Sequence, residues 1–523
     1  MKKILYFSYV LLLCLVLSCT KNELIEEDPK GFLNDQTLFD TEAGAQAALV
    51  GCYAGISTYY YFGVAYTQFL SLGSGAFWTD HAASLPLAKQ ISQPTDALIN
   101  NVWKEAYASI NSVNALLANM PKSPIKESVK NQILGEGHFL RAVLYFNNVR
   151  TWGDVPLRIE VANSNNLNMA RTPKAQVYEQ IIADLEAAKN LLPAPQAQIK
   201  GRPHKWAAYA LLAKVYLTLA ENVDGSPYWK KAYDEAIQVY NSNAYTLVRP
   251  YKNLWDVSKQ NSSESIFEIQ YSMAGGSSNG LTQIHMPSNT IYTPNQASSP
   301  TRRIRTHKAT FNEFRNQYPG DPRINATFLY GDVPKKDGTT LKVYPTNTSS
   351  GEGYPYIFKY ADPAWVASVS NSNFIYLRYA DVLLMLAEIE NELNGPGGAY
   401  KYINEVLSRA RDANGNGIAE AGEISPANWS GMTQAQFRDR IMLERRIELL
   451  GETHEFYDTR RRGLAYLKAY FISHNTHPGF SATNDFTFPV DETSVSRLLL
   501  MPIPSEEINS NGLINASNQN PGY

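Results

Sequence analysis

The segment 204–221 is apolar on two sides of a predicted helix, and this pattern most narrows the folds open to the chain. One stripe consists of Trp206, Tyr209, Ala213, Tyr216 and Ala220. A second stripe, on a different side, consists of Ala208, Leu212, Val215 and Leu219. A helix that is apolar on two sides must be covered on two sides, as in stacked helical hairpins. The next predicted helix, 228–241, follows after a short turn, so the chain is expected to contain packed helix pairs.

A second helix pair is predicted at 378–411. Its first helix carries apolar residues at helical spacing, namely Val382, Leu383, Leu386, Ile389 and Leu393. A Gly-Pro-Gly-Gly turn at 395–398 leads into a helix with Tyr402, Val406 and Ala410. Each pair spans about 34 residues, which is the tetratricopeptide period, and its aromatic and alanine positions resemble that repeat. The match is degenerate, and a generic helical array would give the same pattern.

Further helices are predicted on either side of a long polar segment. Their expected ranges are 41–57, 97–119, 127–151, 174–192, 433–450 and 453–471, and the helix of the second pair is expected to begin at 376. The segment 243–375 is rich in Ser, Asn, Thr, Gly and Pro, with short β-like runs such as Ile266–Ile269. Such long irregular segments usually carry function or are disordered. We therefore predict an all-α, tetratricopeptide-like scaffold with long loop-rich insertions, forming one unit with regions 38–242, 243–375 and 376–523.

The N-terminus reads as a lipoprotein signal. Lys2 and Lys3 precede an apolar run of 14 residues, Ile4 to Leu17. A bilayer core needs about 20 residues, so this run predicts a signal peptide over 1–18 and not a membrane anchor. The sequence Val-Leu-Ser-Cys at 16–19 resembles a bacterial lipobox, which would place fatty acid such as palmitate on Cys19. The alternative is an ordinary secretory signal with an incidental Cys. Residues 19–37 are polar and are expected to form a tether.

Charge and cysteine content exclude several classes of protein. The formal net charge is −2, which provides no basic field for nucleic-acid phosphates. The chain has three cysteines, and with Cys14 in the signal and Cys19 acylated only Cys52 remains. An internal disulfide is therefore not expected, and Cys52 is predicted to be a buried, inert thiol. Neither the zinc-protease pattern H-E-x-x-H nor the phosphate-binding G-x-x-x-x-G-K-[ST] occurs, so these two kinds of site are not predicted.

One loop fits the calcium-binding pattern D-x-N-x-N-G-x5-E of an EF-hand. Its predicted ligands are Asp412, Asn414, Asn416, the carbonyl of Ile418, Glu420 and Glu423, with Gly417 at the sharp turn. A predicted helix ends near Arg411, as the motif requires, but the next begins only near Thr433. The loop predicts one structural Ca²⁺; the alternative is an Asn/Gly-rich loop with incidental carboxylates.

Several blocks, taken together and in this order, resemble the SusD/RagB family of outer-membrane lipoproteins from Bacteroidetes. They are Gly135–Ala142 continuing to Trp152–Leu157, Asp321–Arg323 with Thr327-Phe328, Arg378–Leu384, Ile403–Val406 with Arg409–Arg411, Glu444–Leu449, Phe456–Asp458 with Arg460-Arg461, Met501–Pro504 and Asn520–Tyr523. The segment Gly451–His454 departs from the family pattern. Charged residues in these blocks, such as Glu136, Arg141, Arg378, Asp381, Glu444, Arg445 and Arg460, are interpreted as interhelix pairs and caps.

The resemblance implies a function. Members of this family bind an oligosaccharide outside the cell, help load it into a TonB-dependent transporter and are not enzymes. It therefore implies a lipid-anchored outer-membrane protein that faces the exterior, with the transporter as partner. Some relatives handle peptides, which leaves a peptide-binding component as an alternative, and a lipid-anchored glycoside hydrolase as a more remote one.

Candidate sugar-binding residues follow from chemistry. An aromatic ring covers the C–H face of a sugar, and polar side chains satisfy its hydroxyls. The loop 77–81 offers Trp78, Asp80 and His81, in a region where family members place binding aromatics. The insertion offers Tyr292, Asn295, Tyr354 and Trp365. A role in local packing is the alternative for each of them.

Overall fold

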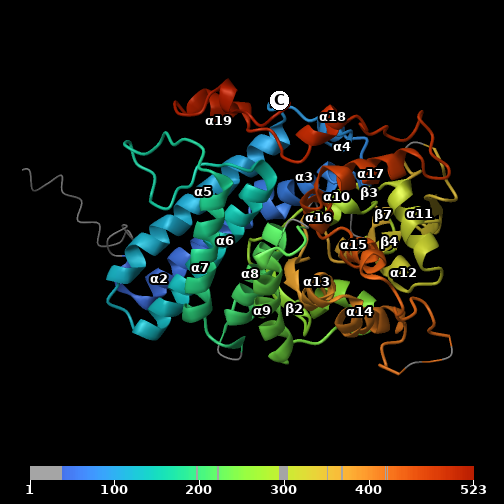
Figure 1. Cartoon of the computed structure of the whole chain (residues 1–523), viewed down its shortest axis with the longest axis horizontal. Coiled ribbons are helices and arrows are strands. Elements are labelled where there is room, and N and C mark those ends of the chain that lie inside the picture. Colours follow the sequence, from blue (N-terminus) through green and yellow to red (C-terminus); the bar gives the residue numbers. More distant parts are fainter. Residues whose placement is uncertain are drawn as a thin grey trace, which may run out of the picture.

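Helices dominate the computed structural model of the chain, as Figure 1 shows. The structure describes residues 38–195, 198–220, 223–293, 304–349, 351–366, 369–418, 420 and 422–523. The predicted signal peptide, Cys19, the tether and Asn295 lie outside these residues. No helix within the described ranges is long and apolar enough to cross a membrane.

Six helices of the N-terminal half pack against one another. They are α2 (Glu42–Ile56), α5 (Ala97–Asn119), α6 (Glu127–Trp152), α7 (Lys174–Leu191), α8 (Lys205–Ala220) and α9 (Pro227–Asn241), and the pairs α6–α7, α7–α8 and α8–α9 make extensive contacts. Both apolar sides of α8 are buried, since Ala208 and Leu212 as well as Ala213 and Tyr216 are inaccessible or nearly so. The helix is covered on two sides, as its sequence predicts.

The array continues directly into the C-terminal half. Helix α13 (Tyr379–Asn394) packs on α9, and α14 (Pro396–Arg411) and α15 (Gln434–Leu449) both pack on α13. The segment between α9 and α13 therefore leaves the stack and returns to it, as an insertion does. The all-α prediction and the two predicted hairpins, α8–α9 and α13–α14, are confirmed.

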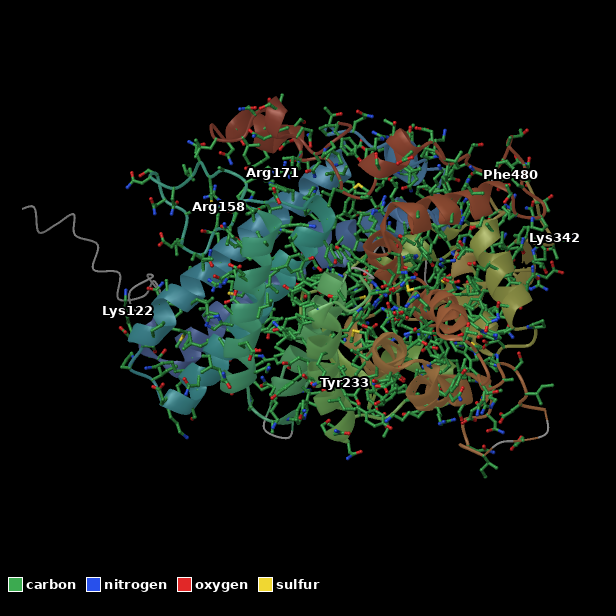
Figure 2. All side chains as sticks on the ribbon, viewed as in Figure 1. Lys122, Arg158, Arg171, Tyr233, Lys342 and Phe480 are labelled. Carbon is green, nitrogen blue, oxygen red and sulfur yellow. The ribbon has the colours of Figure 1, made fainter. Side chains whose placement is uncertain are left out.

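The insertion builds the other end of the molecule. It contains α10 (Leu281–His285), α11 (Lys308–Gln317), α12 (Arg323–Thr327) and two antiparallel strand pairs, β4 (Phe328–Leu329) with β7 (Tyr356–Ile357) and β5 (Asp332–Pro334) with β6 (Thr340–Lys342). Two further antiparallel pairs connect it to the rest of the chain. In one, β1 (Phe77–Trp78) of the N-terminal half pairs with β3 (Arg305–Thr306), and in the other β2 (Ser265–Ile269) pairs with β8 (Phe374–Arg378), which leads into α13. Figure 2 places Lys342 at the opposite end of the molecule from Lys122, which directly precedes the α6 region.

The structure differs from the predicted elements at three points. The expected helix start at 376 is wrong, because 374–378 form β8, whose apolar residues are buried and paired with β2. The expected helix 453–471 is two helices, α16 (His454–Arg461) and α17 (Gly463–Asn475), which separate at Gly463 with its φ of +80°. Helix α3 (Ala65–Gly73) was not predicted, since all nine of its residues are buried and show no polar face.

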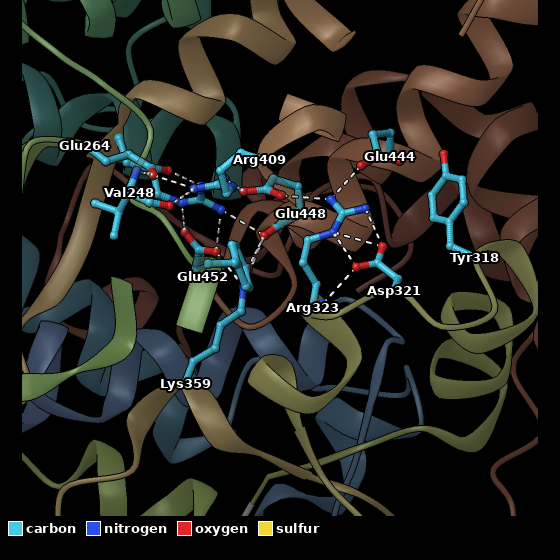
Figure 3. Close-up of polar contacts among 12 residues, drawn as sticks. Val248, Glu264, Tyr318, Asp321, Arg323, Lys359, Arg409, Glu444, Glu448 and Glu452 are labelled. Atoms are coloured by element: carbon cyan, nitrogen blue, oxygen red, sulfur yellow. Dashed lines mark hydrogen bonds and ion pairs between the residues drawn. The ribbon is translucent and has the colours of Figure 1, made fainter. Parts of the chain in front are cut away.

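A buried ion-pair network joins the insertion to the helical array (Figure 3). Glu448 on α15 pairs with Arg323 of the insertion at 2.8 Å and with Arg378 at 2.8 Å. It also pairs with Arg409 on α14. Removing one member of a buried ion network leaves an uncompensated charge, so these residues hold the two parts together. Of the family-block charges interpreted as pairs and caps, Arg378 and Glu444 are paired in this network, Glu444 with Arg323 at 2.7 Å.

Cys52 is buried in α2, and burial raises the pKa of its thiol to about 12. The predicted burial of Cys52 is therefore confirmed, and the raised pKa favours the protonated thiol. Three short helices complete the described chain: α4 (Leu85–Ala88), α18 (Glu492–Arg497) and α19 (Ser505–Ser510).

Candidate functional site

A groove of about 890 Å³ lies in the insertion. Its walls come from the 3-10 turn Tyr251–Trp255, the residues after β2, the start of α12 and the turn that follows β7. The aromatic members of its lining are Trp255, Tyr271, Tyr292 and Phe358. The polar members are Lys252, Asp256, Ser258, Gln260, Asn325, Asp362 and Asn371. A concave, largely apolar site with a few polar groups is the usual form of a ligand pocket.

Three of the aromatic rings are half-buried and so present surface to the groove. Tyr292 and Phe358 lie edge to face, with ring centroids 4.8 Å apart. Trp255 stands on the opposite segment of the lining, in the turn that begins at Tyr251. Held rings lose little conformational entropy when a ligand stacks on them.

The Trp255 ring makes a cation–π contact with Lys359. The Lys359 ammonium lies 4.4 Å from the centre of the Trp255 ring, and it pairs with Glu452 at 2.7 Å. Figure 3 shows Lys359 reaching Glu452 inside the ion network. Burial lowers the pKa of Lys359, while Glu452 opposes that shift. Through Lys359, the Trp255 ring is therefore connected to the buried ion-pair network.

Two lining residues carry buried polar atoms without a protein partner. The indole Nε1 of Trp255 and the hydroxyl of Tyr271 make no hydrogen bond within the described structure. Tyr271 is only 6% exposed, and burial raises the pKa of its phenol well above the ordinary value. An unmade buried hydrogen bond costs roughly 1–3 kcal/mol, so a ligand that supplies an acceptor here recovers that cost.

The polar rim is organised by turns. Asp362 accepts hydrogen bonds from the backbone N–H of Ala364 and Asn371 and from the Ser370 hydroxyl, each at 2.9 Å. Gln260 donates to the Asn371 carbonyl at 3.1 Å. Both Asp362 oxygens therefore accept hydrogen bonds from this turn, and the carboxylate shapes the rim.

The predicted loop at 77–81 lies elsewhere. Trp78 is 5% exposed and is stacked on Tyr354 with ring centroids 4.1 Å apart, and on Phe486 at 5.8 Å. Its neighbour Asp80 is exposed and pairs with the buried Arg305 at 3.1 Å. His81 contacts the Ser84 hydroxyl at 2.9 Å. The structure thus brings Trp78 and Tyr354 together, but within the interior.

The other predicted residues are divided. Tyr292 lines the groove, whereas Trp365 is fully buried and does not. Asn295 lies outside the described residues. Sequence reasoning missed Trp255, Tyr271 and Phe358, since an aromatic residue in a loop has no local pattern that shows which surface it will face.

The calcium-type loop adopts part of the expected turn. Gly417 donates its N–H to Asp412 at 3.0 Å, and Glu423 folds back to accept from the N–H of Ala413 at 2.8 Å. The Asp412 carboxylate also pairs with Arg249 at 2.6 Å. Among the described residues, no group of three His, Cys, Asp or Glu side chains is placed to hold a metal. As they lie, the acidic side chains do not fit a calcium cage, and the calcium site stays a prediction.

Comparisons with known proteins cover nearly the whole chain. The sequence profile of the SusD family matches residues 263–523, and a profile described as starch-binding and associating with the outer membrane matches residues 30–217. The SusD-like protein P2 of Formosa agariphila is 31% identical, with 99% of each chain aligned. A SusD-like protein of Bacteroides ovatus is 24% identical over 49% of this chain and 48% of its own.

Solved structures agree on the fold. A SusD homolog from Bacteroides thetaiotaomicron superposes with a TM-score of 0.77 at 20% identity, covering 94% of this chain and 98% of its own. A laminarin-binding SusD-like protein superposes with a TM-score of 0.72 at 25% identity, covering 93% of this chain and 100% of its own.

Proposed function

The chain belongs to the SusD family, and we propose that it is an outer-membrane lipoprotein that binds an oligosaccharide in the groove and delivers it to a TonB-dependent transporter. Proteins of this family are glycan-binding components of the outer membrane, and one relative in fold binds laminarin. The family supplies the class of ligand, and the groove supplies the location.

One observation supports this location: Trp255 and Tyr271 line the same cavity as Tyr292 and Phe358, and each of the two carries a buried donor without a protein partner. A neutral sugar offers an apolar C–H face to a ring and hydroxyl oxygens to N–H and O–H donors. The groove provides both, and its volume of about 890 Å³ lies in the range of ordinary ligand pockets. A site built to hydrogen-bond hydroxyls also rejects ligands that lack them.

The proposal includes no bond cleavage. A glycoside hydrolase needs two carboxyl groups that face each other across the scissile bond at roughly 5–10 Å. The groove contains Asp256 and Asp362, and each is engaged by its own turn: Asp362 as described above, and Asp256 by the N–H and hydroxyl of Ser258. Binding without catalysis is the function that this arrangement favours.

Attachment and transport complete the proposal. Fatty acid on Cys19 would tie the chain to the outer membrane, facing the exterior, with residues 19–37 as the tether. The transporter would contact the helical array. Asp80, His81 and Asn295 remain proposed as further ligand contacts, and the buried Trp78, Tyr354 and Trp365 would contribute only if the loops above them move.

The sharpest test removes a single oxygen atom. Tyr271→Phe deletes a hydroxyl that has no partner in the folded protein, so the free energy of unfolding should not fall. Binding of laminarin oligosaccharides, measured by calorimetry, should weaken about tenfold, the size of one lost hydrogen bond of ~1.4 kcal/mol. Tyr60→Phe, at an exposed tyrosine that does not line the groove, is the matched control and should bind as wild type does.

The same titrations separate the alternatives. Equal affinity of wild type and Tyr271→Phe would remove the groove as the glycan site. Binding of peptides and of no glycan in a panel of neutral oligosaccharides would favour the peptide-binding alternative. Appearance of shortened sugars during the titration would favour a hydrolase.

A further inference from the structure

A second cavity lies within the helical array, apart from the groove. Its volume is about 390 Å³, and none of its lining residues lines the groove. It is formed where the C-terminal end of α6, the N-terminal end of α7 and the middle of α8 meet α16. Figure 1 shows α6, α7 and α8 side by side, with α16 to the right of α8. The proposed oligosaccharide function makes no use of this cavity.

The lining is strongly cationic. Six of its side chains are basic, namely Arg150, Lys174, Lys214, Arg445, Arg460 and Arg461, and only Glu452 and Asp458 are acidic. Both acids are already occupied by two cations each. Glu452 pairs with Arg378 at 2.6 Å and Lys359 at 2.7 Å, and Asp458 pairs with Arg445 at 2.9 Å and Arg461 at 2.8 Å. Arg461 also pairs with Glu388 at 2.6 Å and Lys214 with Asp381 at 3.0 Å, so the positive charge left to the cavity comes from Arg150 and Arg460.

Arg150 is a cation of this lining for which the described residues provide no carboxylate partner. Its guanidinium lies between two rings, 3.7 Å from the centre of Phe146 and 3.6 Å from that of Tyr457. It donates to the Phe146 carbonyl at 3.1 Å and to the Asn147 amide oxygen at 2.8 Å. The stacking fixes the plane of the guanidinium and leaves its charge uncompensated.

Arg460 is another lining cation without a carboxylate partner among the described residues. It is 7% exposed and donates to three backbone carbonyls, those of Gly73, Phe456 and Leu498, but to no carboxylate within the described ranges. Burial lowers its pKa to about 9. Arg445, which is 1% exposed, adds an Nη1 group that makes no hydrogen bond. Buried charge and a buried unmade donor are both costly without a counter-ion.

The pKa of His454 is affected by the charged groups around the cavity. Burial, and next the neighbouring Lys214, lower the pKa of His454 to about 3. The ring is therefore neutral, and its Nδ1 accepts a hydrogen bond from Lys214 at 3.1 Å. Asp381 pairs with Lys214 at 3.0 Å and with Arg445 at 2.9 Å, so this acid is also shared between two cations. The groups that face the cavity thus favour a negative guest.

We propose that this cavity binds a small oxyanionic group, a carboxylate or sulfate, carried by a solute about the size of one sugar. Arg150, Arg445 and Arg460 would supply the donors, and the tyrosine rings of Tyr66, Tyr178, Tyr376 and Tyr457 would enclose the solute. Guanidinium groups bind carboxylate and sulfate oxygens through charge-assisted hydrogen bonds, which are about twice as strong as neutral ones. A cavity of about 390 Å³ is large enough for a monosaccharide and too small for a longer chain to enter whole.

Calorimetry with three probes tests the proposal: glucuronate, inorganic sulfate and glucose, at constant ionic strength. Wild type should bind glucuronate and not glucose. Sulfate binding of equal strength would identify a site for the free anion, and weaker sulfate binding would identify a site for the sugar acid. Absence of binding by both anions, or glucose binding equal to that of glucuronate, would overturn the proposal.

Substitutions locate the binding. Arg150→Gln and Arg460→Gln should each weaken glucuronate binding at least tenfold, whereas Arg150→Lys should weaken it less because the charge remains. Arg315→Gln, at an exposed arginine outside the cavity, is the matched control. Trp255→Ala, in the groove, should leave glucuronate binding unchanged, so failure of the groove proposal and failure of this one are separable. Arg460 also donates to three backbone carbonyls, so circular dichroism must show that Arg460→Gln is folded. If that variant is not folded, the comparison of Arg150→Gln with Arg150→Lys tests the site. Unchanged binding by Arg150→Gln would contradict the site.

Discussion

Replacing Glu448 by Gln should destabilise the protein by about 3 kcal/mol at neutral pH. Glu448 is fully buried and pairs with Arg323, Arg378 and Arg409. Burial raises its pKa, but the three arginines outweigh that effect and lower it from 4.5 to about 2. A pKa lowered from 4.5 to about 2 corresponds to ~3 kcal/mol of stabilisation of the folded state. Breaking buried ion pairs typically costs a similar 3–5 kcal/mol.

The sign of the pH dependence follows from the lowered pKa. The stabilisation by Glu448 is fully present above about pH 4.5, the pKa expected in the unfolded chain, and is lost as the pH falls toward 2. Urea unfolding of wild type and Glu448→Gln should therefore differ by ~3 kcal/mol at pH 7, and the gap should narrow by about 1 kcal/mol between pH 4.5 and 3.5. Glu506→Gln, at an exposed carboxylate, should differ from wild type by less than about 0.5 kcal/mol. A Glu448→Gln variant as stable as this control at pH 7 would refute the view that the network joins the insertion to the array.

Two further predictions concern the lipid and the calcium loop. Cys19→Ala should abolish incorporation of labelled palmitate and release the protein from the membrane fraction, whereas Cys52→Ala should keep the label; labelled Cys19→Ala protein would contradict lipidation at that residue. Arg249→Ala removes the cation that pairs with Asp412, so added calcium should raise its unfolding midpoint more than that of wild type. An unfolding midpoint independent of calcium in both proteins would remove the calcium hypothesis.

Local periodicity was sufficient to predict most of the scaffold. The two stripes of α8 and the Gly-Pro-Gly-Gly turn before α14 are local signals, and the structure has both hairpins where they place them. Helix α3 was not predicted because a helix that is buried on every side has no polar face, and its sequence therefore shows no periodic alternation of polar and apolar residues. The strand β8 was not predicted because a short apolar run fits a strand or a buried helix equally well. Only its pairing with β2 in the structure shows that it is a strand.

The site was less predictable, because its parts come from separate segments. Tyr292 was predicted as a binding residue and lines the groove, but Trp255, Tyr271 and Phe358 meet it only after the insertion has folded. Trp78 resembled an exposed loop residue, yet Tyr354 and Phe486, both far away in the sequence, cover its faces. The Trp255 Nε1 and the Tyr271 hydroxyl can be identified as donors without a partner only when the folded structure is known.

The central claim is that this groove holds a sugar, and a crystal structure of the protein with a laminarin oligosaccharide tests it most directly. We predict a sugar ring against Trp255, with hydroxyl oxygens accepting hydrogen bonds from the Trp255 Nε1 and the Tyr271 hydroxyl. An oligosaccharide bound at the Trp78–His81 loop, with the groove filled by solvent alone, would contradict the account.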